Sequence, residues 1–308
     1  MSTPSFPPLK EPTHEIHSIT LRTSASAPWL VFSNGLNTDW RMWSFVIPVM
    51  LDQGFNMLLH SQRGHGLSTL PPPTEGQERL TTIPLLAMDI YHLLEELKIP
   101  TPVRSVIGVS QGGATTLGFA GLYGEKTKSV VACDTAAATP LGNKEAWEER
   151  TRVVCGSSED GWWKEGNGNV DMEAYAEKVG MGKLGKMTMA RWFPEGSACH
   201  PGSRLDSRVE WMEDMIERTR VRGFYHGAKA LGSYDVRSEK MVGKKVLLVA
   251  GSLDGGGRVG QGMRRLKEEW QSEYVEIESS GHLPMIDAPD VFCDVVLSFL
   301  GYNLLSCI

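Results

Sequence analysis

The sequence lacks any apolar stretch of the roughly 18–20 residues that a membrane-spanning helix needs. Its N-terminal segment, MSTPSFPPLKEPTHEIHS, has no apolar core of the kind that marks a secretory signal peptide, and none is expected. Basic residues form no block either, because 31 lysines and arginines are spread among 37 acidic residues and leave a net charge of −6. These absences predict a protein whose main partner is neither nucleic acid nor membrane.

Cysteine is also sparse, and its spacing excludes the usual cysteine-based sites. The five cysteines are Cys133, Cys155, Cys199, Cys293 and Cys307. An odd number without a CxxC pair predicts neither a disulfide framework nor a zinc cluster. Because disulfides are rare in reducing compartments, a cytoplasmic location is expected.

What the sequence does have is a regular alternation of short apolar runs and helical patterns. With 308 residues, 41% of them hydrophobic, it is long enough to build a full core. Strands are predicted at 28–35, at the start of 55–68, at 103–110, at the start of 127–137, at 244–251 and at 274–278. Helices are predicted at 45–54, 81–100, 111–124, 258–270 and 288–301. This alternation predicts an α/β fold with a mostly parallel sheet and helices on both faces.

Residues 138–222 interrupt the alternation. They are rich in glycine and charged residues, show no clear strand, and hold Trp147, Trp162, Trp163, Trp192 and Trp211. We predict a helical cap inserted late in the sheet. Residues 1–14, rich in proline, serine and threonine, predict a loose tail. The sheet and its helices are then expected in 15–137 and 223–308.

The stretch GVSQGG at 108–113 places a serine between glycines, after a β-branched strand and before a helix of small residues. This order resembles the nucleophile elbow of α/β-hydrolases, in which a tight turn exposes the serine at the edge of the sheet. Gly108 and Gly112 leave room for the strand and the helix to pass closely. Ser110 is therefore the predicted nucleophile.

A serine hydroxyl needs a base to take its proton, and the base needs an acid to orient it. In this fold the chain order is serine, acid, histidine. His282 follows the last predicted strand and precedes the last helix, so it is the predicted base. Asp254, just after the strand at 244–251, is the predicted acid. Asp134, which follows the strand after the nucleophile, is the alternative acid.

Backbone N–H groups are expected to stabilise the oxyanion of the reaction. The N–H of Gln111 directly follows the nucleophile. The second donor is expected in the loop after the strand at 28–35, where the N–H of Leu36 is the first candidate and that of Gly35 the next.

These segments resemble the α/β-hydrolase superfamily along nearly the whole chain, and within it the 3-oxoadipate enol-lactonase group. The stretches that carry the resemblance are FSNGLNTDWRMW (32–43), QRGHGLS (62–68), GVSQGG (108–113), CDTAA (133–137), ARWFP (190–194) and SSGHLPMIDAPDVF (279–292). The resemblance implies a hydrolase that cleaves a lactone or ester without a metal or a cofactor. It also implies Ser110, Asp254 and His282 as the triad, with Leu36 and Gln111 as oxyanion donors.

The sequence departs from that group just before RGHG, where Ser61 and Gln62 stand in place of the usual aspartate. The cap segment CGSSEDGWWKEGNGNV and the three glycines after Asp254 also differ. Because cap residues shape the pocket in this fold, these departures leave the substrate open.

Pocket residues are less sharply indicated. Arg191 and Trp192 of ARWFP are candidates for holding a substrate carboxylate, since arginine pairs with one bidentately, and packing roles are the equal alternative. Trp163 is a candidate pocket wall, again with packing as the alternative. Arg63 and His65 of RGHG are expected to support the neighbouring loop rather than to act in catalysis.

Three function classes follow. The complete Ser-His-Asp set favours a serine hydrolase that cleaves a small lactone or carboxylic ester through an acyl-enzyme. The alternatives are a hydrolase of a C–C bond in a diketone-like substrate with the same triad, and a small-molecule receptor that turns over slowly. The oligomeric state is not indicated.

Overall fold

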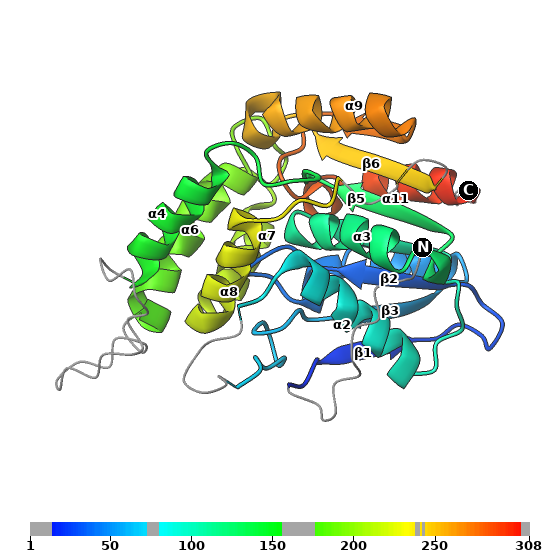
Figure 1. The fold of residues 1–308 in the computed structure, drawn as a ribbon. Coiled ribbons are helices and arrows are strands. Elements are labelled where there is room, and N and C mark those ends of the chain that lie inside the picture. Colours follow the sequence, from blue (N-terminus) through cyan, green and yellow to red (C-terminus); the bar gives the residue numbers. More distant parts are fainter. Residues whose placement is uncertain (1–13, 73–79, 156–175, 238–240, 242–243, 303–308) are drawn as a thin grey trace.

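The computed structural model describes residues 14–72, 80–155, 176–237, 241 and 244–302, and these residues contain one seven-stranded sheet (Figure 1). The strands lie in the order β1-β3-β2-β4-β5-β6-β7. Their bounds are β1 Ser18–Leu21, β2 Trp29–Ser33, β3 Asn56–His60, β4 Ser105–Val109, β5 Ser129–Cys133, β6 Lys245–Gly251 and β7 Glu273–Ile277. Only the edge strand β1 runs antiparallel to its neighbour, so the predicted mostly parallel sheet is confirmed.

The register of the central strands aligns their carboxyl ends. Ser33 of β2 pairs with Gly108 of β4, and Cys133 of β5 pairs with both Val109 and, on its other side, Val249 of β6. The residues that follow β2, β4, β5 and β6 therefore emerge side by side at one edge of the sheet. This edge is where ligands bind in open α/β folds.

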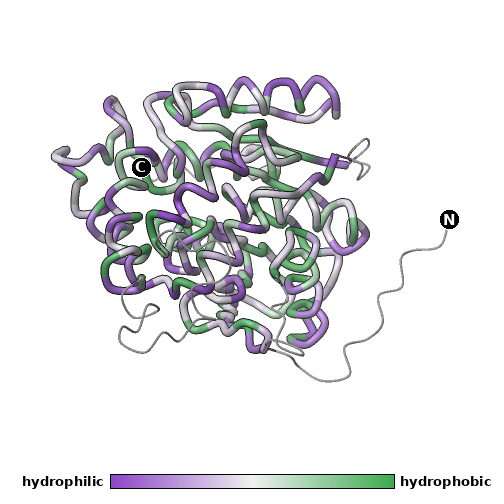
Figure 2. The backbone as a smooth tube through the Cα atoms, turned by 60° about the vertical axis from the view of Figure 1, so that its left-hand side comes forward, coloured by the Kyte–Doolittle hydropathy of each residue, from purple (hydrophilic) through white to green (hydrophobic). Residues whose placement is uncertain are grey.

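The two faces of the sheet form two separate hydrophobic cores, because side chains alternate along each strand. Leu30 and Phe32 of β2 point into one core, which α1 and α11 also line. Trp29 and Val31 point into the other, beneath α2, α3 and α9. These helices are α1 Ile47–Asp52, α2 Ile83–Glu96, α3 Gln111–Leu122, α9 Arg258–Trp270 and α11 Pro289–Leu300. Figure 2 shows the exposed turns of α9 as hydrophilic and the strands beneath them as hydrophobic.

The cap lies between β5 and β6 in the sequence and beyond the carboxyl ends of the strands in space (Figure 1). Its described elements are α4 Asn143–Cys155, the short turn η3 Ala176–Gly180, α6 Met181–Trp192, α7 Asp206–Glu217 and α8 Val221–Gly232. The boundary expected between 222 and 223 falls inside α8, which packs against α4. The helical layer thus extends to Gly232.

The remaining described elements are short and connect the larger ones. They are η1 Trp40–Trp43, η2 Gly124–Lys126, η4 Asp254–Gly257 and α10 Pro284–Asp287. None of the helices within the described ranges is both long and apolar enough to cross a membrane.

Candidate active site

Ser110 lies in a tight turn and has an unusual backbone conformation. It joins β4 to α3 with φ 56° and ψ −118°, in the region that L-residues rarely adopt. A Cβ at Gly108 would lie 2.2 Å from the carbonyl oxygen of Gly112, and one at Gly112 would lie 2.1 Å from that of Ser33. Both positions therefore require glycine, because a side chain at either one would collide with neighbouring backbone, as the predicted close passage of strand and helix implies.

His282 and Asp254 form a buried hydrogen-bonded pair. The ring Nδ1 of His282 lies 2.7 Å from Oδ2 of Asp254, and both side chains are shielded from solvent. Burial raises the pKa of Asp254, but the charge of His282 and its hydrogen bond outweigh burial and place that pKa below its usual value. Asp254 is thus an ionised acceptor, and Nε2 of the same ring is left for another partner.

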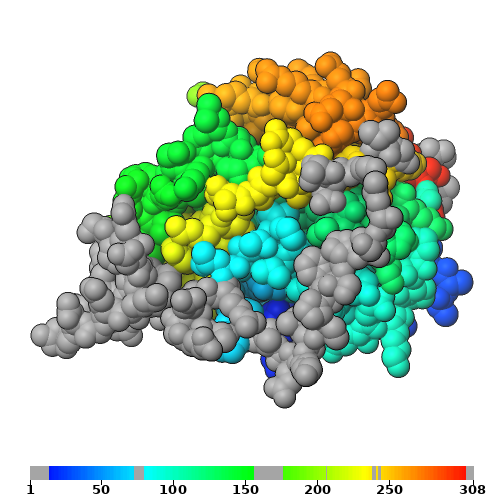
Figure 3. All heavy atoms as spheres, in the orientation of Figure 1, coloured from blue at the N-terminus to red at the C-terminus, as the bar shows by residue number. Residues whose placement is uncertain are grey.

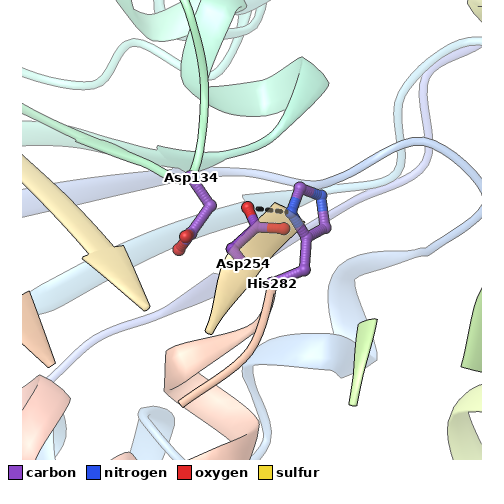
Figure 4. A group of neighbouring side chains, drawn as sticks. All are labelled: Asp134, Asp254 and His282. Atoms are coloured by element: carbon purple, nitrogen blue, oxygen red, sulfur yellow. Dashed lines mark hydrogen bonds and ion pairs between the residues drawn. The ribbon is translucent and has the colours of Figure 1, made fainter. Parts of the chain in front are cut away.

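Asp134 lies beside this pair (Figure 4), and in the described structure the hydrogen bond of His282 Nδ1 goes to Asp254. Its Oδ1 accepts the N–H of Gly251 at 2.9 Å, and its Oδ2 is buried. The structure therefore joins His282 to Asp254 and leaves Asp134 in a neighbouring position. In the described part of the chain, Asp134, Asp254 and His282 are also the one set of possible metal ligands, with ligand atoms within 4.8 Å of one another. Because Nδ1 is engaged by Asp254, the set is arranged as an acid–base pair.

The loop after β2 brings two further predicted residues to the nucleophile. A Cβ at Gly35 would lie 3.7 Å from that of Ser110, so this loop runs directly alongside the serine. Leu36 is buried next to it, and Gln111 is the first residue of α3. Neither the N–H of Leu36 nor that of Gln111 donates to another group of the described chain. Within the described residues, both N–H groups are therefore available to another acceptor.

Residues 62–65 support the loop at 34–38 through two hydrogen bonds. Gln62 donates from Nε2 to the carbonyl of Gly35 at 3.1 Å. The N–H of Asn37, which has φ 66°, donates to Nε2 of His65 at 3.1 Å. Burial lowers the pKa of His65 to about 4, so the ring stays neutral and can accept this bond. The expected supporting role of His65 is confirmed by these contacts.

Arg63 is not among the residues that line the cavity described below. It makes a bidentate, fully buried ion pair with Asp89, at 2.8 and 2.5 Å. Its role is likewise structural, because the pair fastens the RGHG segment to α2.

The cap helix α8 contacts the same loops through two glycines one turn apart. A Cβ at Gly223 would lie 2.0 Å from the carbonyl oxygen of Gly64, and one at Gly227 would lie 2.2 Å from a methyl of Leu36. Gln111 also donates from Nε2 to the carbonyl of Gly227 at 2.8 Å. The cap thus contacts these loops through the backbone at Gly223 and through the side chains of Leu36 and Gln111 at Gly227.

The carboxyl end of α6 contacts the loop that carries His282. The carbonyl of Trp192 accepts the N–H of His282 at 2.9 Å, and the indole ring stacks on the imidazole with 5.7 Å between centroids. A Cβ at Gly281 would lie 2.0 Å from the same carbonyl. Trp192, a predicted pocket residue, therefore also fixes the histidine loop.

A cavity of about 720 Å³ connects these groups. Ser110, His282, Leu36, Arg191 and Trp192 all line it, so the structure brings together five of the predicted site residues. Figure 3 shows the surface where α4 (green) and the segment after α8 (yellow) meet α9 (orange), and the outer lining residues come from these three segments. Trp163 lies outside the described residues.

Sequence reasoning missed several lining residues, of which Trp147 and Tyr234 are the largest. Trp147 was noted only as part of the tryptophan-rich segment, and Tyr234 stands in no motif. Their approach to the cavity depends on how the cap helices pack, for which a single sequence carries no signal.

Comparison with known proteins agrees with this architecture. A profile of the alpha/beta hydrolase family matches residues 30–295. The chain is 27% identical over 271 residues to 3-oxoadipate enol-lactonase 2 of Acinetobacter baylyi, which covers 87% of this chain and 86% of that enzyme. It is 26% identical over 286 residues, 92% of each chain, to 3-oxoadipate enol-lactonase 1 of the same organism.

Solved structures give the same result. An enol-lactonase from Burkholderia xenovorans LB400 superposes with a TM-score of 0.74 at 26% identity, covering 94% of this chain and 97% of its own. A thermophilic esterase from Thermogutta terrifontis has a TM-score of 0.73 at 21% identity over 94% of this chain and 93% of its own, and it shares the fold. The chain belongs to the alpha/beta hydrolase family and resembles its enol-lactonases.

Proposed function

We propose that this protein is a serine hydrolase that cleaves a small lactone or carboxylic ester, with Ser110 as nucleophile, His282 as base and Asp254 as the orienting acid. One observation supports this more than any other. The strained Ser110 and His282, whose ring is hydrogen-bonded to Asp254, line one cavity. A residue is kept in such a backbone conformation only where the surrounding structure compensates its cost, which is typical of functional sites.

The proposed mechanism begins when Nε2 of His282 takes the proton of Ser110 Oγ as that oxygen attacks the ester carbon. The carbonyl oxygen becomes an oxyanion, which accepts hydrogen bonds from the N–H groups of Leu36 and Gln111. When the intermediate collapses, the imidazolium returns its proton to the departing oxygen. With a lactone, that oxygen stays attached to the acyl chain. Water, deprotonated by His282, then attacks the acyl-enzyme and releases the acid.

The cavity further favours an anionic substrate. Within the described chain Arg191 has no hydrogen bond or ion pair, and its guanidinium lies over the ring of Trp192, 5.9 Å from the centroid. Burial and the nearby Arg150 lower the pKa of Arg191 to about 10, so it remains charged at neutral pH. A carboxylate in the cavity would pair with the guanidinium of Arg191.

The rest of the cavity lining is also rich in positively charged side chains. Arg191, Arg237, Arg258 and Arg265 line the cavity together with one glutamate, Glu269, and the aspartate Asp134. In a chain with a net charge of −6 this excess of arginine is local. The relatives named for 3-oxoadipate enol-lactone act on a lactone of a dicarboxylic acid, and such a ring keeps one carboxylate. We propose a carboxylated lactone or ester as the substrate class.

The test is hydrolysis followed by pH-stat over carboxylated enol-lactones, saturated lactones and aryl esters, with the wild type, Ser110→Ala and Arg191→Ala. We expect Ser110→Ala to lose about 10⁶-fold in kcat, as triad serines do. Arg191→Ala should raise KM for the carboxylated substrates and leave uncharged esters nearly unaffected. Near-normal turnover by Ser110→Ala would contradict the assignment.

The other two classes give distinct results in the same assay. A C–C hydrolase would release two carbon fragments from a diketone while failing to open lactones. A slow receptor would become labelled at Ser110 by a fluorophosphonate but would show no multiple turnover on any substrate of the panel.

A further inference from the structure

Asp134 is a buried carboxyl group that the proposed mechanism does not use. Its side chain is 2% exposed and borders the cavity between β5 and η4. One ligand atom each from Asp134, Asp254 and His282 lie within 4.8 Å of one another (Figure 4). Two carboxyl groups at such a separation in a buried site do not both ionise readily, because like charges repel and water is excluded.

The groups around Asp134 offer it no cation of its own. Facing it are the N–H of Gly251 on β6, Asp254 on η4, Asp287 on α10 and the thiol of Cys133 on β5. His282 and Arg191 lower the pKa of Asp254. Burial first, and then the charge of Asp254, raise the pKa of Asp134 well above its usual value. Of the two carboxyl groups, Asp134 is therefore the one that favours its protonated form.

The hydrogen bonds of Asp134 leave one of its two oxygens available. Oδ1 of Asp134 accepts from Gly251, so Oδ2 is the oxygen that remains, and among the described residues it has no hydrogen-bond partner. Asp254 is the neighbouring carboxyl group, with a ligand atom within 4.8 Å of one of Asp134. We propose that Asp134 is a positioning residue, which stays protonated and donates a hydrogen bond from its carboxyl group to Asp254, holding Asp254 against His282.

This role, which rests on the proposed triad, differs from that of a triad acid. A neutral donor stabilises the ionised form of Asp254 without placing a second negative charge beside the imidazole. Asp254 then keeps one oxygen for Nδ1 of His282 while its rotamer is held from the side of β5. The triad would thus be extended to a chain of four groups.

The backbone of Asp134 decides which variants test this cleanly. Its φ is 43°, which asparagine and glycine adopt readily and alanine does not. Asp134→Asn keeps an acceptor for Gly251 and offers an amide N–H to Asp254. Asp134→Gly tolerates the same backbone and removes both bonds. The pair separates the hydrogen bond from backbone strain.

The first readout is the rate at which a fluorophosphonate labels Ser110, together with kcat on p-nitrophenyl acetate. Asp134→Gly should be about 10- to 100-fold slower, as expected for losing a hydrogen bond to a charged group. Asp134→Asn should recover most of that loss, and the acid limb of its pH–rate profile should keep the wild-type midpoint. Equal impairment of both variants, or a midpoint lowered by about one pH unit in Asp134→Asn, would mean that an ionised Asp134 is required. Unimpaired Asp134→Gly would exclude any positioning role.

The second readout does not depend on activity. A carboxyl group with a raised folded-state pKa stabilises the fold below its unfolded value, near 4, and this stability is lost as pH rises toward the folded value. The advantage of Asp134→Asn over wild type, measured by urea unfolding in a Ser110→Ala background, should therefore grow above pH 4. The growth can reach about tenfold in the folding equilibrium constant per pH unit.

A difference that stays constant from pH 4 to pH 8 would overturn the protonated assignment. If Ser110 proved unreactive in the wild type, the proposed function would fail. The unfolding series would still decide the state of Asp134.

Discussion

The two halves of the candidate site are built in different ways. Around Ser110, contacts are between backbone atoms, and Gly108 and Gly112 leave no space for a side chain. Around His282, contacts are between buried side chains, with Asp254 bonded to the ring and Asp134 beside it. The half around Ser110 therefore depends on glycines that have no side chain, and the half around His282 depends on where the charged side chains lie.

This difference predicts how each half responds to change. A conservative substitution in the acid–base half alters chemistry while the fold survives, since the replaced atoms are the ends of side chains. A one-carbon addition in the nucleophile half forces the strand and helix apart. Substitutions matched in size should therefore separate loss of catalysis from loss of folding.

The largest effect on catalysis within this comparison is expected for Asp254→Asn. An amide cannot stabilise the imidazolium and offers the wrong hydrogen-bonding pattern to Nδ1, so kcat should fall about 10⁴-fold. The urea midpoint should stay close to that of the wild type. Asp134→Asn serves as the matched control, with a much smaller loss of kcat. The reverse ranking would move the acid to Asp134.

The next effect is on folding. In Gly112→Ala the new methyl group would lie 2.1 Å from the carbonyl oxygen of Ser33, which is backbone and cannot turn aside. We expect a loss of roughly 3 kcal/mol or more in the free energy of unfolding, the upper range for overpacking. Gly262→Ala on α9, where no atom lies within 4 Å, is the control and should be neutral or slightly stabilising. Equal stability of the two variants, measured by urea unfolding, would contradict the backbone account of the elbow.

The smallest effect lies where the cap meets the oxyanion loop. In Gly227→Ala the added methyl group meets a methyl of Leu36 at 2.2 Å, and a leucine tip can move. The fold should survive, while displacement of the Leu36 N–H lowers kcat about tenfold, less than the full loss of an oxyanion donor. Gly232→Ala on the same helix meets only a carbon of Lys144 at 3.7 Å and should retain kcat. If the two variants had the same kcat, the contact between α8 and the loop at Leu36 would have no effect on catalysis.

Much of the fold could be predicted because its signals are local. The run at 258–270 has helical spacing and forms α9, and VRSVIGVS contains the strand β4. The elbow could be predicted because its glycines and serine are adjacent in the chain. Chain order and position after strands pointed to Asp254 and His282, which lie 28 residues apart and meet at 2.7 Å.

Other features could not be predicted because they join segments that only the folded chain brings together. Ser61 and Gln62 stand where an aspartate was expected, and only the structure shows the amide of Gln62 on the carbonyl of Gly35. The contact of Gly227 with Leu36 joins a cap helix to an early loop. Asp134 was weighed as an acid, but the sequence shows no sign of its raised pKa, which comes from burial beside Asp254.

The backbone conformation of Ser110 affects the stability of the whole protein. A non-glycine residue held at φ 56° carries strain of about 1–3 kcal/mol, a sizeable share of the roughly 5–15 kcal/mol that separates folded from unfolded chains. Selection for stability alone would replace this serine with glycine, which would relax the turn and leave a sturdier, inert protein. If Ser110 is the nucleophile, activity and robustness are opposed at this one position, and its retention records which of them was favoured.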